Sequence, residues 1–332
     1  MDARVLGAPA CASVALAPVP AAAAQNGLVR ANDVVDERED GSGAFRTHCL
    51  QAHASHDDPL VYPGQPGAAH HHVFFGNPDV DARTTIADLN GASRTTCDGG
   101  TPNRPAYRVP ALCGQRGERI ECVEPLFCYK TGYDLPASSM LSPPEGLQTI
   151  AGDAHALAPQ GTHVVAFRCA RGKSERAWFD PGDPLDHVDF LPDRSKEDPL
   201  EARVVLPQCR DGQNLSAPDN RSHMAYPSDA EPSAAGTGTC PVSHPVAIPE
   251  TSYDFAVHVT SETGSTSTWR FSSDRPDVTA PGASLHADRM NGWDADIADI
   301  IDAIVANCLR PARDCGVGLV GDGPRQRPVV DA

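Results

Sequence analysis

The chain has 332 residues and a formal net charge of −17 at pH 7, with 27 basic and 44 acidic side chains. Binding to the phosphate backbone of a nucleic acid requires a basic surface, and so acidic a chain lacks one. A nucleic acid is therefore excluded as partner. The 28 glycines and 31 prolines favour many turns and short strands over long helices. We therefore expect a mainly β chain with minor α content, folded as a single β-sandwich-like domain that acts as a monomer.

Residues 1–25 contain an alanine-rich apolar run that ends in small residues. This pattern resembles a secretory signal peptide, and a disordered Ala/Pro tail is the alternative. Of the 11 cysteines, Cys11 lies inside this segment, so its removal leaves an even number for pairing. No other run approaches the roughly 20 apolar residues of a membrane helix. We expect a secreted or periplasmic protein without a membrane span.

After the leader, we expect a flexible lead-in at 26–43, a folded domain at 44–318 and a disordered tail at 319–332. Alternating or β-branched residues predict extended runs at 162–169, 202–206, 253–260 and 267–272. From Asp294 onward, isoleucines recur at the spacing of an amphipathic helix. We predict that this C-terminal helix packs on the sheet.

The remaining cysteines favour disulfides over a zinc site, because no Cys-x-x-Cys spacing occurs. Two local pairs are predicted, Cys209 with Cys240 and Cys308 with Cys315. Cys113, Cys122 and Cys128 crowd into a short region, which suggests a disulfide-pinned excursion. A cysteine nucleophile is not expected if all of these thiols are paired.

The most distinctive stretch of the sequence is three consecutive histidines, His70-His71-His72, followed by Val73-Phe74-Phe75-Gly76-Asn77. If this stretch is extended, His70 and His72 point to one face and His71 to the other. Two imidazoles on one face of a strand can reach the same ligand. We expect more distant polar residues to converge with them, namely His53, Arg221, His223, His244, His286 and Asp288.

One interpretation of this convergence is a transition-metal site for Zn or Cu. Neutral imidazoles bind these ions through one ring nitrogen, while the other nitrogen is oriented by a further partner. The predicted ligands are His70, His72, His223 and His286. The alternative is that these histidines only make hydrogen bonds that hold the structure together.

A second interpretation is acid–base catalysis, by a hydrolase or a lyase, on a polysaccharide. A hydrolase needs two carboxylates, and a lyase needs a base such as histidine or tyrosine. The predicted catalytic residues are His72, Arg221, His223, Tyr226 and Asp288, with Asn77 and Asp211 as further site residues. The Asp57-Asp58-Pro59 segment is typical of a turn instead. Nucleophile-elbow, P-loop, dinucleotide-binding and His-Glu-x-x-His motifs are absent.

A third interpretation is a non-catalytic module that binds glycan or cell wall, in which buried histidine, aspartate and arginine networks only hold loops in place. The same residues support all three interpretations.

Several separate motifs occur in a fixed order along the chain. They include Asp57-Asp58-Pro59-Leu60-Val61-x-Pro63-Gly64, His70-x-His72-x-Phe74-Phe75-Gly76-Asn77, Leu206-Pro207-x-Cys209, Ser222-His223-Met224-Ala225-Tyr226-Pro227, Cys240-Pro241-x-x-His244-Pro245 and His286-x-Asp288. This set resembles the DUF1996 family over residues 45–315. Two departures are Arg210, where the family usually has tryptophan, and the inserted region between Cys113 and Cys128.

The resemblance implies a secreted protein, because DUF1996 domains occur in secreted fungal and bacterial proteins. Some of these proteins also carry carbohydrate-binding modules. The implied partner is therefore an extracellular polysaccharide or cell-wall material, although such context does not identify an activity.

Overall fold

The computed structural model describes residues 29–30, 43–97, 103–131, 135–136, 139–169, 188, 190–193, 200–228, 237–277, 280–293 and 319–320. These parts of the chain are mainly β, and their helices are the short α1 (Ile86–Asn90) and the 3-10 helix η3 (Thr266–Thr268). The prediction of a mainly β chain is confirmed. The helix expected from Asp294 onward and the expected Cys308–Cys315 pair lie outside the described residues.

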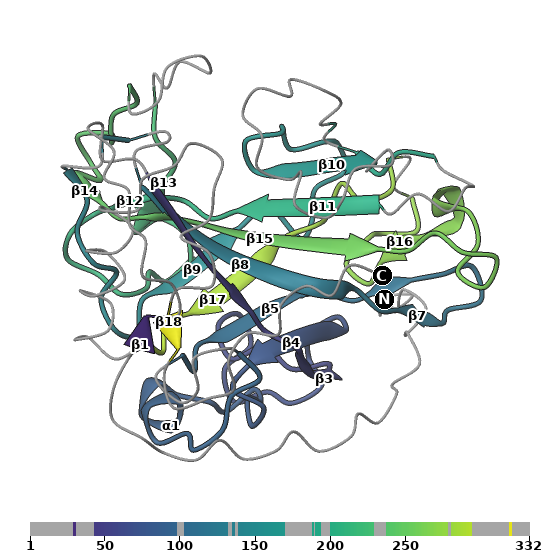
Figure 1. Cartoon of the computed structure of the whole chain (residues 1–332), viewed down its shortest axis with the longest axis horizontal. Coiled ribbons are helices and arrows are strands. Elements are labelled where there is room, and N and C mark those ends of the chain that lie inside the picture. The colour runs from purple at the N-terminus through teal and green to yellow at the C-terminus, as the bar shows by residue number, and fades with distance from the viewer. Residues whose placement is uncertain are drawn as a thin grey trace, which may run out of the picture.

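Two antiparallel five-stranded sheets form most of the described structure. The first has the order β10 (Val165–Cys169), β11 (Leu200–Val205), β15 (Glu250–Val257), β8 (Val123–Thr131) and β2 (Gly43–His48). The second has the order β3 (Gln51–Ser55), β4 (His72–Gly76), β5 (Ala106–Pro110), β17 (Ala287–Met290) and β9 (Gln148–Ala151). In Figure 1, strands of the second sheet run at an angle to β8 and β15 of the first.

Smaller sheets extend these two. They are β13 (Met224–Ala225) with β12 (Cys209–Arg210) and β14 (Val246–Ala247), β16 (Arg270–Phe271) with β6 (Leu112–Cys113) and β7 (Arg119–Ile120), and β1 (Val29–Arg30) with β18 (Leu319–Val320). The expected runs at 162–169, 202–206 and 253–260 contain most of β10, β11 and β15, and the run at 267–272 is divided between η3 and β16.

The two large sheets share one apolar core. The ring of Phe127 on β8 stacks on Tyr107 of β5 with centroids 4.1 Å apart, and lies 5.5 Å from Phe75 of β4. Because side chains alternate along a strand, Val73 and Phe75 face this core while His72 and Phe74 face the opposite side. The histidine strand therefore presents its polar side to the outer face of the second sheet.

That outer face is covered by a second apolar cluster made of Leu60, Phe74, Val80, Leu89, Ala106, Ile150 and Met290. Leu60 comes from the segment between β3 and β4, and Val80 and Leu89 come from the segment between β4 and β5, so both segments fold back over the sheet. This apolar cluster buries the neighbouring polar side chains of β4, β5 and β17. The candidate site therefore lies between the sheet and these two segments.

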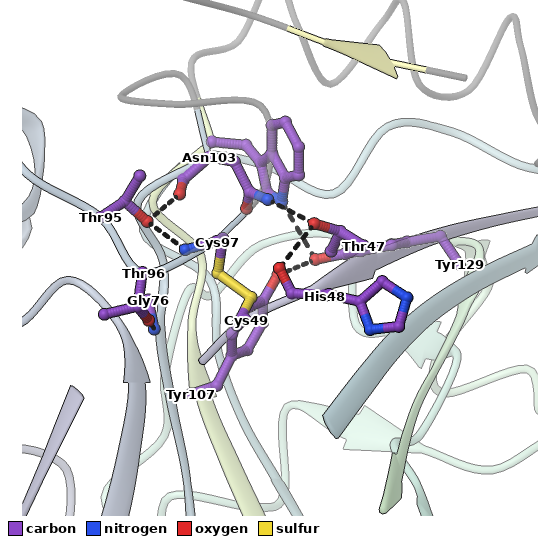
Figure 2. The surroundings of a disulfide bond; sticks show 11 residues. Thr47, His48, Cys49, Gly76, Thr95, Thr96, Cys97, Asn103, Tyr107 and Tyr129 are labelled. Atoms are coloured by element: carbon purple, nitrogen blue, oxygen red, sulfur yellow. Dashed lines mark hydrogen bonds between the residues drawn. A yellow bond between two sulfur atoms is a disulfide. The ribbon is translucent and has the colours of Figure 1, made fainter. Parts of the chain in front are cut away.

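A disulfide between Cys49 and Cys97 fastens the end of the histidine strand (Figure 2). Next to it, the Gly76 nitrogen donates to Thr96 Oγ1 at 2.9 Å, and the Thr96 nitrogen donates to the Gly76 oxygen at 2.8 Å. One residue before Thr96, Thr95 Oγ1 donates to the Asn103 oxygen at 2.6 Å. These bonds tie the chain just before Cys97 to the end of β4 and to Asn103.

The predicted Cys209–Cys240 disulfide is confirmed, and Cys113 is disulfide-bonded as well. Cys122, one of the cysteines expected to pin the excursion between Cys113 and Cys128, is a free thiol instead. Burial among apolar side chains raises the pKa of Cys122 to about 12, so its reactive thiolate form is rare at neutral pH. The Cys128 thiol donates a hydrogen bond to Asp254 Oδ2 at 3.2 Å.

Candidate metal centre

Three of the predicted histidines meet on the outer face of the second sheet. His70 precedes β4, His72 begins it, and His286 precedes β17. The ring centroids of His70 and His72 are 4.1 Å apart, and that of His286 is 4.9 Å from His70. One nitrogen from each of the three rings lies within 4.8 Å of the others. Zinc–nitrogen bonds of about 2.0–2.1 Å place two ligand atoms at most about 4 Å apart. Small side-chain movements would therefore bring the three ring nitrogens within reach of one ion.

Backbone carbonyls fix the tautomers of two of these rings. His72 Nδ1 lies 3.1 Å from the Asp57 oxygen, and His286 Nδ1 lies 2.8 Å from the Ser284 oxygen. Because a carbonyl oxygen only accepts, each Nδ1 carries the proton and each Nε2 keeps its lone pair. Metal-binding histidines are oriented in this way by their other nitrogen.

The atoms that face one another in this cluster have no hydrogen-bond partner. They are His70 Nε2, His72 Nε2 and Asp288 Oδ1, all of them buried. Leaving a buried acceptor unpaired costs about 1–3 kcal/mol. His72 belongs to both groups of side chains that could hold a metal, one with His70 and His286 and one with Asp58 and Asp288, and a divalent cation would satisfy the unpaired acceptors in them.

Arg108, Asp58 and Asp288 form a buried ion triad next to the three histidines. Arg108 donates from Nε to Asp288 Oδ2 at 2.9 Å and from Nη2 to Asp58 Oδ1 at 2.5 Å. Asp58 Oδ1 also accepts from the backbone nitrogens of Leu60 and Val61, at 2.8 Å each. Asp288 Oδ2 is 4.0 Å from His72 Nε2, so the triad holds a carboxylate beside the imidazoles.

The pKa values of the three imidazoles are lowered, chiefly by burial. That of His70 falls to about 2, with contributions from His286 and Arg108. Burial, together with the charges of His70 and Arg108, holds the pKa of His72 well below 6.5. The pKa of His286 is lowered by burial and raised in part by Asp288. All three rings are therefore neutral at pH 7, the form that binds metal.

Three other predicted site residues have structural roles. His53 stacks on Phe74 with ring centroids 4.5 Å apart. Asn77 Oδ1 accepts from the Asp79 nitrogen at 2.9 Å in the turn after β4. The Tyr226 hydroxyl donates to the Val205 oxygen at 2.7 Å. Burial raises the pKa of Tyr226 above its ordinary value, which makes it a poor base near pH 7.

The structure does not bring His223 to the cluster. Its Nε2 lies 2.6 Å from the Gln148 oxygen, and Gln148 pairs with Met290, whereas Ala151 pairs with Ala287 next to His286. His223 and His286 therefore lie at opposite ends of β9, roughly 10 Å apart along the strand. Among the described residues, His223 belongs to neither group that could hold a metal.

Arg221, His244 and Asp211 lie in the loops around His223. Arg221 is exposed, and its charge contributes to the lowered pKa of His286. His244 Nε2 contacts the Ser222 oxygen at 2.9 Å. Asp211 caps a turn, and the Asn214 N–H lowers its pKa to about 2. Among these three residues, Arg221 has an electrostatic effect on the cluster, through His286.

Two residues of the site were not among the predicted ligands or catalytic groups. Arg108 is a single charge in the otherwise apolar segment Ala106–Pro110 of β5, a pattern that indicates a buried ion pair. Asp58 was interpreted as a turn residue. It fills that role through Leu60 and Val61, and it also binds Arg108.

These features define a mainly β, disulfide-bonded protein with a buried histidine–carboxylate site. The family model of a domain of unknown function, DUF1996, matches residues 58–293, and the chain belongs to this family. The family prediction is thereby confirmed. No curated protein and no solved structure matches the chain.

Proposed function

We propose that the protein binds a divalent transition metal, Zn or Cu, through His70, His72 and His286. The observation that carries the proposal is that one ring nitrogen from each of the three histidines lies within 4.8 Å of the others. His70 Nε2 and His72 Nε2 are buried without a hydrogen-bond partner, and carbonyl contacts hold Nδ1 of His72 and His286. Asp288 lies beside this set, with Oδ1 unpaired. Imidazole ligands favour Zn and Cu over Mg or Ca, which prefer oxygen.

Export to an oxidising compartment is part of this proposal. Disulfides persist outside the cytosol and are rare within it, and Cys49–Cys97 and Cys209–Cys240 are both disulfides. Within the described parts of the chain, no helix has the length and apolar character needed to cross a membrane.

The test is the metal content of protein purified from an oxidising compartment, measured by mass spectrometry. We expect one Zn or Cu per chain in the wild type, and loss of that metal in His72→Gln. Added metal should also raise the thermal unfolding temperature of the wild type by mass action, and leave that of the variant unchanged.

His223→Gln is the matched control, because His223 is as buried as His72 but lies at the far end of β9. It should keep the metal. Well-folded wild type that takes up neither ion would refute the metal proposal, and equal loss in both variants would move the site away from the His70 cluster.

A second candidate function is metal-assisted hydrolysis or lysis of an extracellular polysaccharide, by a monomeric protein. The observation that favours it is that His70 is only partly buried, although its Nε2 atom is covered, and that three protein ligands leave a coordination position open. Catalytic zinc sites keep such a position for water or substrate. Asp58 and Asp288 are less suited to act as a glycosidase pair, since both are buried and bound to Arg108.

A panel of neutral and acidic polysaccharides, incubated with metal-loaded protein, tests this second candidate. Release of reducing ends or unsaturated sugars by the wild type, and not by His70→Ala, would support catalysis. Binding of a glycan without product formation would instead indicate a glycan-binding or cell-wall module.

A further inference from the structure

Arg119 on β7 is a buried arginine with only part of its charge compensated. Its side chain is 1% exposed, and Nη2 donates at 3.0 Å to Glu121 Oε1, whose own side chain is 59% exposed. The other two nitrogens, Nε and Nη1, are buried without a hydrogen-bond partner. Desolvated charged donors are expensive to leave unpaired, so this guanidinium requires a further acceptor.

The backbone register places Arg119 on the same face as His71. Arg119 is directly opposite Cys113 across the β6–β7 pair. Two residues before Cys113, the Ala111 nitrogen donates to the His71 oxygen at 2.8 Å, and this bond continues the pairing of β4 with β5. Paired residues and alternate residues along a strand point to the same side. His71 and Arg119 therefore share one side of this sheet corner.

His71 also has unused polar atoms. Its side chain is buried, and apart from a contact with the Ala54 backbone, which raises its pKa, neither ring nitrogen has a hydrogen-bond partner. The ring stacks on His56 with centroids 4.8 Å apart and planes 12° apart, and His56 is half-buried. Burial, then the charges of His56 and Arg119, lower the pKa of His71 to about 4, which agrees with a guanidinium close to the ring.

We infer that Arg119 and His71 bind a small oxyanion, of the size of sulfate, phosphate or a carboxylate group. The guanidinium and the imidazole N–H donate, and an oxyanion accepts several such bonds at once. A cation is excluded by the charge of Arg119, and an apolar ligand would leave the donors unpaired. His56 forms the outer side of the site, because it is the half-buried member of the stack.

This anion site is distinct from the proposed metal centre. His70 and His72 face the metal centre, whereas His71 lies between them on the other face of the strand. Sulfate and carboxylate groups also occur on acidic extracellular polysaccharides, so inorganic sulfate and acetate are suitable probes for the two chemistries.

The test is thermal unfolding of the whole chain in a metal chelator, with sulfate, phosphate or acetate at a total ionic strength held constant with chloride. We expect a saturable rise in the unfolding temperature for at least one oxyanion, through preferential binding to the folded state. Arg119→Gln should raise the half-saturating concentration about tenfold or more, since a charge-assisted hydrogen bond is lost.

Arg116→Gln is the matched control, because Arg116 lies on the same hairpin and its side chain is 80% exposed. It should leave the response unchanged. His72→Gln should also leave it unchanged, which separates the anion site from the metal proposal. Equal responses in Arg119→Gln and Arg116→Gln, or no saturable response in the wild type, would overturn the inference.

If Arg119→Gln does not fold, equilibrium dialysis with radiolabelled sulfate decides between the outcomes. One sulfate bound per wild-type chain, with weaker binding by His71→Phe, supports the site. Wild type that binds no sulfate, phosphate or acetate overturns it.

Discussion

The Nδ1 atom of His72 donates a hydrogen bond to the main-chain oxygen of Asp57, 3.1 Å away. This bond connects the histidine strand to the turn that covers it. The next residue of the turn, Asp58, binds Arg108, which binds Asp288 on β17. The turn therefore orients the His72 imidazole through the main-chain oxygen of Asp57. It also positions the Asp288 carboxylate, because the Asp58 side chain binds the same arginine as Asp288. Both contacts leave metal-binding atoms pointing into the same space.

The first prediction concerns the number of imidazole ligands. Wild-type protein loaded with Cu(II) should show three coordinated imidazoles by electron paramagnetic resonance, because His70, His72 and His286 each offer one nitrogen. His70→Ala should show two. His244→Ala, which removes a half-buried imidazole bound to Ser222 outside the cluster, should leave the spectrum unchanged. A spectrum unchanged by His70→Ala would contradict the assignment.

The second prediction concerns stability against pH in metal-free protein. The pKa values of His72 and His286 are below the ordinary 6.5 in the folded state, mainly through burial. As pH falls below 6.5, the unfolded chain takes up these protons first, so stability is complete above that pH and declines below it. Each such group contributes a slope of about 1.4 kcal/mol per pH unit.

Urea unfolding in a chelator between pH 7.5 and pH 5 measures this slope. His72→Gln should reduce it by close to one proton, and His244→Gln should leave it as in the wild type. An unchanged slope in His72→Gln would show that His72 titrates normally in the folded protein.

The sequence predicted the parts of the site that follow from local periodicity. Alternation along an extended strand placed His70 and His72 on one face, and the structure agrees. The motif His286-x-Asp288 also places both side chains on one face of β17, because they are two residues apart. The mainly β architecture followed from the abundance of turn residues and the alternating runs.

The parts that depend on long-range register could not be read from the sequence. His223 and His286 both lie beside β9, but at opposite ends of it, and only the pairing of β9 with β17 separates them. Arg108 was overlooked for the same reason. Its partners Asp58 and Asp288 are 50 and 180 residues away in the chain, and no local pattern relates them.

The third prediction concerns the buried triad. Arg108→Leu removes the cation between Asp58 and Asp288 and leaves two buried carboxylates without their counter-ion. We expect a loss of about 3–5 kcal/mol in the free energy of unfolding, measured with urea. Arg83→Leu is the control, since its side chain is 66% exposed, and it should change stability by less than about 0.5 kcal/mol. A similar small effect for Arg108→Leu would show that the carboxylates do not depend on it.

The fourth prediction concerns the glycine that ends the histidine strand. Gly76 has φ +90°, and a Cβ built there would lie 2.0 Å from the Pro105 oxygen. The neighbouring Asn77 nitrogen donates to that same oxygen at 3.2 Å, so the carbonyl cannot move away without losing a bond. Gly76→Ala should therefore lower the free energy of unfolding by about 3 kcal/mol or more, through backbone strain and overpacking combined.

Gly64→Ala separates these two causes. Gly64 also has a positive φ, +72°, but a Cβ there would have no atom within 4 Å. It should cost only the conformational part, about 1–2 kcal/mol. Urea unfolding of both variants gives the comparison. Equal losses would mean that the Pro105 carbonyl yields to the new methyl group, and that conformation alone requires glycine at the end of β4.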